Sequence, residues 1–582
     1  MGFFEYINLN NQIRSFQSLN KFGNTPQVAD PIWCPIEGSI PPWVNGILYR
    51  TGPGKYNLGD DEKQYVIQHA FDGLPFVHRF ELSAEKQAVR YNNRMIAEEV
   101  ESKLVKNPNS NQLFFGHVPS WSNWRGFINM LTRLGSIAVA PSKNERDRSN
   151  KMVGVTVTPN FPLPSKFSLA PNDDHVLVTK TDANILQHVH STTLEPERLF
   201  DYSDYDENFA GVLSAAHHQR DPNTNETFNF SINFGRETSM TVFSIDAKGN
   251  NKVLAKITQR LLPNGKQSSI LPAYIHSFWL TENYVIIPES PLHYANNGLD
   301  VLVHGVISTA MAWKEDSPTY LHVISRDPSV GHVVSLPVDN PFFTFHTGNA
   351  WDYVDKDGNP VLELECCAVD SGDILYQVAR YGGMERYEGE NKQKHLTPMN
   401  QGKQRGMTIP PSPTTEFGDF HRYRATWNKK AKTGQVSYNV IAKNVEFPRF
   451  APQLACQKTR YVWGCQHESA TANNSERFSL IKLDTETGKI TKIDQGCTMF
   501  SEPVFVPNPD SKTGDEDDGA LLSFANFIDP RGSHHDRCIL SVVDAKTMKE
   551  MGRCDIGQFV ATTFHGSFVD VDFTLQVSIF SI

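Results

Sequence analysis

The chain has 582 residues, of which 39% are hydrophobic and 11% aromatic, so it has enough apolar material for a large buried core. Its formal net charge is −10. An acidic chain without a clustered basic stripe is not expected to bind nucleic acid, because phosphate binding needs a dense lysine and arginine footprint.

The N-terminal segment, MGFFEYINLN, has no basic region followed by an apolar stretch, so we expect no secretory signal. No apolar run in the chain approaches the roughly 20 residues needed to span a bilayer. The eight cysteines are scattered, with no C-x-x-C pair, which is typical of a reduced intracellular protein. The sequence therefore predicts a cytoplasmic protein that is not secreted.

A β-hairpin pattern recurs seven times along the chain. Each copy has an alternating apolar strand, a short turn rich in Asp, Lys, Gly or Pro, and a second strand. The copies lie at residues 80–91, 190–200, 243–257, 322–336, 423–441, 479–493 and 541–554. Seven hairpins with little helical periodicity between them predict a single all-β domain over 1–582, a seven-bladed β-propeller with inserted loops. A β-sandwich or a pair of β domains is the alternative.

One segment between the first two hairpins, Ser120–Val139, has an amphipathic pattern that mixes aromatic and aliphatic residues with two arginines. It is too short and too mixed to span a bilayer. Such a helix can lie in the membrane interface with its aromatic face in the lipid, or it can pack on the propeller as an ordinary helix. The side chains that would contact lipid are Trp121, Trp124, Phe127, Ile128 and Leu131.

Histidines follow four of the hairpins at the same point of the repeat. After each hairpin the chain should return to the propeller axis, and four of the returning segments contain a histidine beside apolar or small residues. A single histidine in an apolar strand is usually a hydrogen-bonded core residue. Four buried imidazoles in register, however, would be costly to desolvate without a metal. The candidate ligands are one of the pair His217–His218, together with His276, His346 and His565.

The ligand type limits which metals can bind but does not identify the metal, because imidazole binds iron, zinc, copper and nickel. Structural zinc sites usually have closely spaced ligands that include cysteine, and no such spacing occurs here. An all-histidine site on distant strands is better suited to keeping coordination positions open for oxygen. Two other returning segments carry a lone glutamate, Glu446 and Glu502. A carboxylate that accepts the second ring N–H of a ligating histidine fixes its orientation; unrelated buried salt bridges are the alternative.

Six short motifs between Pro41 and Phe568 are specific in combination. They are Tyr49–Gly54 (YRTGPG), His69–Gly73 (HAFDG), Ile275–Phe278 (IHSF) with Leu280–Thr281 after it, Glu446–Pro448, Ser501–Pro503 and Phe564–Gly566. In these motifs the sequence resembles the carotenoid cleavage oxygenase family, especially its animal branch. The resemblance implies a seven-bladed propeller with a cap of helices and loops over the metal-bearing face. It also implies one Fe(II) per chain on the axis, with O₂ as co-substrate.

The family's ligands and supporting residues match particular positions of this chain. The resemblance selects His217 over His218, so the expected iron ligands are His217, His276, His346 and His565. Of the family's three supporting glutamates, two match Glu446 and Glu502, and the third aligns with Asp182. Because aspartate is one methylene shorter, its contact with a histidine is either direct or through a water. Phe115 and Thr181 match residues that line the substrate cavity near the iron in animal members.

The resemblance also implies the reaction. A carotenoid would be cleaved at a central double bond into two aldehydes, giving retinal, and an apolar polyene in a dry tunnel needs placement rather than a general acid or base. No catalytic residue beyond the iron centre is therefore expected. The resemblance is greatest to the insect isomerooxygenase, which couples cleavage to trans-to-cis isomerisation in retinoid metabolism and vision. Since the family's substrates dissolve in bilayers, we expect peripheral association with an intracellular membrane through residues 120–139.

Three other activities are compatible with the same motifs. A retinyl ester isomerohydrolase is an iron-dependent relative whose eye-specific form has Pro-Asp-Pro-Cys where this chain has Val118–Trp121. An eccentric-cleaving carotenoid oxygenase would differ only in the shape of its tunnel. A non-catalytic carotenoid-binding propeller is disfavoured because all four histidines are present.

Overall fold

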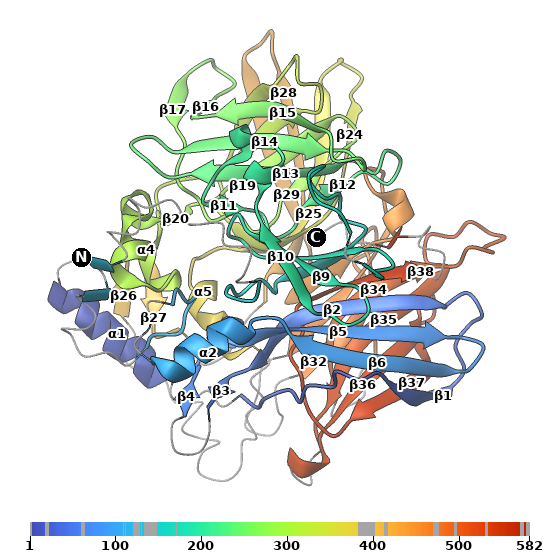
Figure 1. The fold of residues 1–582 in the computed structure, drawn as a ribbon. Coiled ribbons are helices and arrows are strands. Elements are labelled where there is room, and N and C mark those ends of the chain that lie inside the picture. The colour runs from blue at the N-terminus through green and yellow to red at the C-terminus, as the bar shows by residue number, and fades with distance from the viewer. Residues whose placement is uncertain are drawn as a thin grey trace.

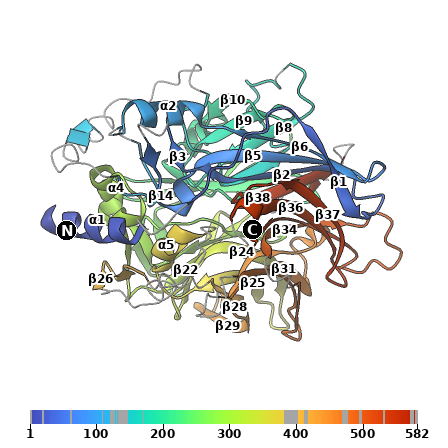
Figure 2. The same ribbon diagram turned by 90° about the horizontal axis from the view of Figure 1, so that it is seen from below.

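The computed structural model describes residues 3–17, 22–59, 64–108, 110, 112–119, 128–129, 131–132, 148–169, 171–381, 402–411, 417–468, 477–493, 498–529, 533–570 and 576–577. These residues form an all-β, propeller-like fold that consists mostly of strands, with few helices (Figure 1). The sheets are arranged around a central region, as the view from below also shows (Figure 2). The seven described cysteines are all free of disulfides.

The first two separate sheets come from the second and third hairpin regions. One has the strands β7 (Thr156–Pro159), β8 (Val176–Lys180), β9 (Leu186–His190) and β10 (Pro196–Phe200). The other has β11 (Leu213–Ser214), β12 (Gln219–Arg220), β13 (Thr227–Asn233), β14 (Ser239–Ile245) and β15 (Asn251–Ile257).

Three further four-stranded sheets follow in chain order. The third consists of β18 (Trp279–Leu280), β19 (Tyr284–Glu289), β22 (Thr319–Ser325) and β23 (His332–Val338). The fourth consists of β24 (Phe343–Val354), β25 (Pro360–Val369), β28 (Asp419–Asn428) and β29 (Thr433–Ala442). The fifth consists of β30 (Val445–Arg449), β31 (Tyr461–Glu468), β32 (Arg477–Asp484) and β33 (Ile490–Ile493).

A ten-stranded sheet combines both ends of the chain. Its C-terminal strands are β34 (Thr498–Pro507), β35 (Gly519–Phe527), β36 (Arg537–Asp544), β37 (Lys549–Gly557), β38 (His565–Asp570) and β39 (Gln576–Val577). Its N-terminal strands are β1 (Ile32–Gly38), β2 (Gly46–Lys55), β5 (Leu74–Ser83) and β6 (Ala88–Met95). β2 pairs with β38, so that Thr51 lies opposite His565.

Short elements complete the described structure. Two-stranded ribbons are formed by β3 (Asn57–Leu58) with β4 (Tyr65–Val66), β16 (Gln259–Leu261) with β17 (Gln267–Ser269), β20 (Leu292–Tyr294) with β21 (Met311–Trp313), and β26 (Gly402–Gln404) with β27 (Met407–Ile409). The helices include α1 (Phe3–Gln17), α2 (Glu98–Lys106), α4 (Leu299–His304), α5 (Ile374–Gln377) and the 3₁₀ turns η1 (Ala70–Asp72) and η6 (Val378–Arg380). The α-helices gather on the left of Figure 1, to one side of the sheets.

All seven hairpins predicted from the sequence are antiparallel strand pairs. They are β5–β6, β9–β10, β14–β15, β22–β23, β28–β29, β32–β33 and β36–β37. Their alternating apolar residues face the core, where side chains such as Phe80, Leu82, Leu540 and Val542 are at most 1% exposed. The alternation and turn chemistry therefore predicted these units correctly.

The backbone hydrogen bonds do not divide the strands into the seven separate blades that the sequence predicts. Apart from the two-stranded ribbons, the described strands form five separate sheets of four or five strands and one ten-stranded sheet. The physical reason is β1, whose first residues, 32–35, pair with β6 and whose last residues, 36–38, pair with β37. This strand joins the first and last hairpin units into one continuous sheet.

The predicted membrane segment is described only in part. Trp121, Trp124 and Phe127 lie outside the described residues, whereas Ile128 and Leu131 are described and are 44% and 50% exposed. Among the helices that the structure describes, none has both the length and the apolar character needed to cross a membrane.

Candidate metal centre

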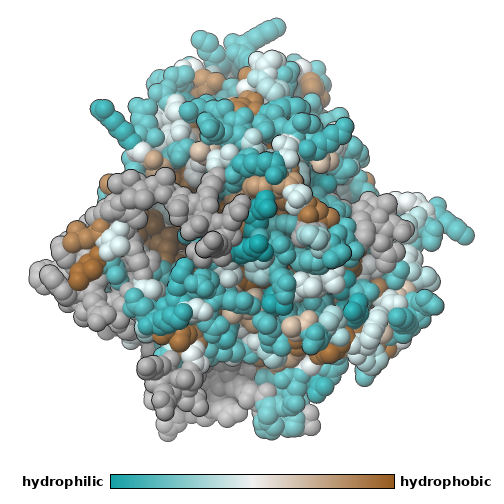
Figure 3. Space-filling view, viewed as in Figure 1, coloured by the Kyte–Doolittle hydropathy of each residue, from teal (hydrophilic) through white to brown (hydrophobic). Residues whose placement is uncertain are grey.

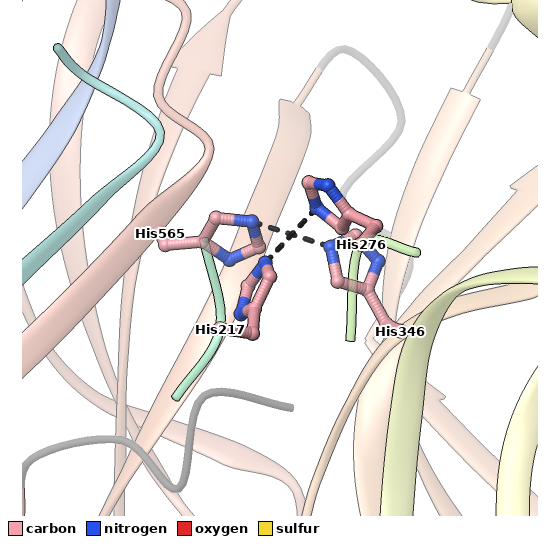
Figure 4. A group of neighbouring side chains, drawn as sticks. All are labelled: His217, His276, His346 and His565. Atoms are coloured by element: carbon pink, nitrogen blue, oxygen red, sulfur yellow. Dashed lines mark hydrogen bonds between the residues drawn. The ribbon is translucent and has the colours of Figure 1, made fainter. Parts of the chain in front are cut away.

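The four expected ligands lie on or next to the innermost strands of four different strand groups. His217 lies between β11 and β12, and His276 comes three residues before β18. His346 lies within β24, and His565 is the first residue of β38. Equivalent points of successive units converge on the central region, so these side chains meet although they are far apart in sequence. Figure 4 shows the four imidazoles turned toward one another.

The geometry of the cluster fits a single metal ion. The Nε2 atoms of His217 and His276 are 3.1 Å apart, and those of His346 and His565 are 3.2 Å apart. One nitrogen from each ring lies within 4.8 Å of the others, and all four residues are buried. Nitrogens 3.1–3.2 Å apart can share a metal at a bond length of roughly 2.0–2.1 Å. The four histidines are thus the group of described residues best placed to hold a metal.

Three of the four imidazole rings form a hydrogen bond with a carboxylate through Nδ1, the ring nitrogen that faces away from the cluster. The Nδ1–H of His346 donates to Glu446 at 2.5 Å, and that of His565 donates to Glu502 at 2.8 Å. Carboxylate oxygens can only accept in these bonds, so the Nε2 lone pairs of His346 and His565 point into the cluster. The carboxylates thereby fix both the tautomer and the orientation of the rings.

Asp182 holds the third ring directly. Its carboxylate oxygens lie 2.9 and 3.0 Å from Nδ1 of His276. The sequence left open whether this contact is direct or through a water, and in the structure it is direct. The backbone brings the shorter side chain close enough, because the N–H of Ser214 donates to the Asp182 carbonyl at 3.0 Å. The hydroxyl of Tyr274 also donates to Asp182, at 2.8 Å, and burial raises the pKa of this tyrosine well above its ordinary value. Tyr274 therefore keeps its proton and steadies the carboxylate.

Local strand irregularities aim several of these side chains. The β24–β25 register shifts between Thr344 and Thr347, around His346. The β34–β35 register shifts between Phe500 and Pro503, around Glu502, and the β30–β31 register shifts just after Glu446. A proline, which has no N–H to give to the ladder, follows Glu502 directly and follows Glu446 two residues later. Bulges of this kind re-aim a side chain, which explains how a regular strand turns these residues inward.

His217 and its neighbour His218 are distinguished by their surroundings. The Nδ1 atom of His217 is buried and has no hydrogen-bond partner among the described residues. Its Nε2 atom faces the cluster, whereas Nδ1 of the equally buried His218 contacts Nζ of Lys180. The structure therefore brings His217 to the cluster and leaves His218 outside it.

Burial keeps two of the four rings neutral. It lowers the pKa of His217 well below its ordinary value, and it lowers the pKa of His565 to about 3. A neutral imidazole offers a lone pair to a metal, whereas an imidazolium does not. His217 and His565 are therefore in the protonation state that metal binding requires near neutral pH.

Two buried arginines, Arg50 and Arg449, are functional neighbours that the sequence analysis did not single out. Arg449 lies 2.7 Å from a carboxylate oxygen of Glu502, and Arg50 lies 3.6 Å from the other. Burial acts to raise the pKa of Glu502, but Arg449, His565 and Arg50 hold it well below its ordinary value. The only signal in the sequence was that each arginine belongs to a quoted motif or follows one directly, in YRTGPG and EFPR.

A cavity of about 1060 Å³ leads to the cluster, and His276, His346 and His565 form part of its wall. Phe115 and Thr181, the predicted cavity residues, both line it. Its wall is largely apolar and includes residues of α4, α5 and η6, which agrees with a helical cap over the histidines. Other aromatic side chains that line it are Phe71, Tyr274, Phe345, Phe447 and Phe564. Such a cavity suits an apolar ligand.

Exposed apolar side chains also line this cavity. Leu113, Val212 and Leu299 are 42%, 52% and 56% exposed. A hollow with hydrophobic side chains is visible on the left of Figure 3, on the side where α1 and α4 lie in Figure 1. Apolar residues exposed around an opening mark a surface that receives an apolar partner.

Comparisons with known proteins agree with this architecture. A family model described as retinal pigment epithelial membrane protein matches residues 22–570. A carotenoid dioxygenase of Neurospora crassa is 28% identical, covering 95% of this chain and 91% of its own length. A torulene dioxygenase of Fusarium fujikuroi is 26% identical over 95% of this chain and 93% of its own length. The mouse beta,beta-carotene 15,15'-dioxygenase is 25% identical over 94% and 90%. Fungal and animal enzymes thus match at similar identity, so the expected animal branch is not singled out.

Solved structures share the fold. A mutant of the Synechocystis apocarotenoid oxygenase superposes with a TM-score of 0.65 at 20% identity, covering 96% of this chain and 99% of its own. The cobalt-substituted form of that oxygenase superposes with a TM-score of 0.64 at 20% identity, covering 94% and 98%.

Proposed function

The chain belongs to the family of the retinal pigment epithelial membrane protein and is a carotenoid-cleaving dioxygenase, and on this premise we propose that it cleaves a carotenoid at a central double bond to give retinal. The observation that carries the proposal is the convergence of four buried imidazoles at the wall of an apolar cavity. In the balanced reaction the two carbons of one C=C bond each gain one atom of O₂, and two aldehydes leave.

We propose that His217, His276, His346 and His565 hold one Fe(II) per chain. Ferrous iron with neutral histidine ligands and open coordination positions supplies the oxygen chemistry of non-heme oxygenases. The chain's part is to hold the ligands: Glu446, Glu502 and Asp182 each fix one ring through its Nδ1–H. The same donor set accepts other divalent metals, which is why the metal content of the isolated protein is a necessary measurement.

The chain's second task is placement of the polyene. Aromatic side chains lie beside the histidines: the ring of Phe345 is 5.3 Å from that of His276, and the ring of Phe447 is 5.0 Å from that of His346. These residues exclude water and restrict where a flat, apolar substrate can rest. Because cleavage needs no proton transfer from the protein, orientation in the cavity is the contribution expected of these side chains.

An isotope experiment tests the reaction. Iron-loaded protein is incubated with β-carotene under ¹⁸O₂, with torulene as a second substrate, and the products are analysed by mass spectrometry. We expect two retinal molecules from β-carotene, each with one ¹⁸O atom. Separation of the retinal isomers tests the coupled trans-to-cis isomerisation.

Other product patterns identify the alternatives. Two unequal aldehydes would indicate eccentric cleavage. Unlabelled retinol from a retinyl ester, with carotene untouched, would indicate an isomerohydrolase. Binding of carotene without any product from the iron-loaded protein would indicate a carrier.

We also propose that the protein takes its substrate from an intracellular membrane on which it docks from the cytoplasm. Support comes from the exposed Leu113, Val212 and Leu299 at the cavity and from the exposed Ile128 and Leu131 in the amphipathic segment. An apolar substrate that enters through such an opening would not cross water.

Two matched valines test the membrane proposal. Val212, which lines the cavity, and Val330, which does not, are both 52% exposed. Val212→Glu is expected to reduce co-flotation with neutral phosphatidylcholine vesicles several-fold, while Val330→Glu is expected to float like the unmodified protein. Equal flotation of both variants would contradict docking at the cavity.

On the fold, we propose that the ten-stranded sheet is two blades joined by β1, which would make seven blades in all. Support comes from the order of strands in this sheet. The hairpin β36–β37 lies beside β34 and β35, and the hairpin β5–β6 lies beside β2 and β38, so each hairpin has the two further strands that a four-stranded blade needs. An experimental structure tests this, because seven blades require the β34–β37 and β2–β6 units to pack face to face as neighbours.

A further inference from the structure

The backbone of residues 115–117 is bound by one buried carboxylate. Asp72 is 2% exposed and accepts three consecutive backbone N–H groups. Its Oδ1 accepts from Phe115 at 2.6 Å, and its Oδ2 accepts from Gly116 at 2.8 Å and from His117 at 2.6 Å. Three amide bonds on one ionised carboxylate make a strong anchor, because bonds to a charged acceptor are stronger than neutral ones.

The same segment is held from its other sides. The side-chain amide of Gln17, in α1, donates to the carbonyl of Gly116 at 2.7 Å and accepts from the N–H of Val118 at 3.3 Å. The carbonyl of Phe115 accepts from the N–H of Ser308 at 2.7 Å. Side chains and loops therefore hold this part of the cavity wall, and no regular β-ladder does so.

Asp72 also connects two aromatic residues of the cavity. Phe71 precedes it in η1, and Phe115 follows from the anchored backbone. The two phenyl rings are 5.3 Å apart. Phe71 in turn lies 6.2 Å from Phe345 and 5.0 Å from Phe564, the residues beside His276 and His565. A displacement of the anchored segment would therefore also move the aromatic side chains next to the histidines.

We propose that Asp72 is a positioning residue that sets the place of the Phe71–Phe115 wall and thereby selects which double bond of the polyene stops beside the histidines. The inference rests on the proposed carotenoid cleavage. The double bonds of a polyene are chemically alike and differ mainly in position, so the walls of the cavity must choose among them. Misplacement by about 1 Å can cost about 100-fold in rate.

The charge state of the carboxylate is consistent with this role. Burial raises the pKa of Asp72 to about 6, and the three amide bonds oppose that rise. Asp72 is therefore ionised at neutral pH and can accept all three bonds. The titratable groups that face it are His69, whose Nδ1 is 3.4 Å away, with His117, Tyr56 and Tyr65 nearby.

The test compares two buried aspartates that each accept a backbone N–H. In Asp72→Asn one carboxylate oxygen becomes an NH₂ group, which faces a backbone N–H and cannot accept from it. Asp173 is the matched control, because its buried carboxylate accepts from the N–H of Ser191 at 2.9 Å and does not line the cavity.

Asp72→Asn is expected to bind as much iron as the unmodified protein. Its kcat for β-carotene should fall about 10–100-fold, with a larger share of eccentric products. Hydrogen–deuterium exchange of the amides at residues 115–117 should accelerate, a readout that does not depend on activity. Asp173→Asn should match the unmodified protein in all of these measurements.

Asp72→Glu provides a second variant if the asparagine variant does not fold, since it keeps the charge and moves it by one methylene. It is expected to shift the product ratio with iron content unchanged. Folded Asp72 variants with unchanged product ratios and unchanged exchange at residues 115–117 would overturn the inference. If the unmodified protein cleaves no carotenoid, the proposed function fails, and the exchange measurement still reports whether Asp72 anchors the segment.

Discussion

Replacing His217 by asparagine is expected to weaken iron binding by at least about 100-fold and to abolish carotene cleavage, whereas the same replacement at His218 leaves both intact. Asparagine can reproduce the position of Nδ1 but not that of Nε2. His217 faces the cluster with Nε2, 3.1 Å from Nε2 of His276, while His218 contacts Lys180 with Nδ1. Loss of an outer hydrogen bond to a metal ligand already costs about 10–100-fold in affinity, so loss of a ligand should cost more.

The two variants differ by one position in the chain and both sites are fully buried, which makes them a stringent pair. Iron per chain is measured by mass spectrometry after dialysis against a chelator, and circular dichroism verifies the fold. Full iron occupancy in His217→Asn would contradict the proposed ligand set. Iron loss in folded His218→Asn would show that the site extends beyond the four histidines.

Replacing Glu502 by glutamine is expected to lower the free energy of unfolding by about 3–5 kcal/mol, because it breaks a buried ion pair and removes the negative charge that lies beside two buried arginines. Arg449 lies 2.7 Å from Glu502, and Arg50 is completely buried on the other side. Glu446 accepts a hydrogen bond from His346, and among the described residues no arginine or lysine forms an ion pair with it. The same substitution at Glu446 should therefore lower iron affinity by about 10–100-fold with a much smaller loss of stability.

Urea denaturation of the metal-free proteins separates the two effects, and iron titration of the folded variants measures affinity. Equal destabilisation by the two substitutions would contradict the role given to the arginines. Unchanged iron affinity in Glu446→Gln would contradict the idea that this carboxylate orients His346.

Features with a local cause were predictable from the sequence. The seven hairpins follow from alternation and turn residues within about 20 positions, and the structure contains all of them. The meeting of His217, His276, His346 and His565 was predictable, because equivalent residues of successive repeats lie at equivalent points around one axis.

Features that depend on pairing between distant segments were not predictable. The division of the sheets depends on β1, whose two partners come from opposite ends of the chain. Whether Asp182 reaches His276 depends on a loop fixed by Ser214. The pairing of Arg50 with Glu502 joins two motifs more than 450 residues apart, and a buried arginine has no sequence pattern of its own.

The pairing of β2 with β38 has a consequence for how the protein is made. Arg50 donates to the carbonyl of Phe564, 514 residues further along, and His565 occupies the strand beside it. During translation three imidazoles emerge long before the fourth, so the cluster is assembled only when His565 has left the ribosome. Contacts of such high sequence separation form slowly. Maturation of the centre is therefore expected to be a late event, once residue 565 has left the ribosome, and a nascent polypeptide stalled before residue 565 should be unable to complete it.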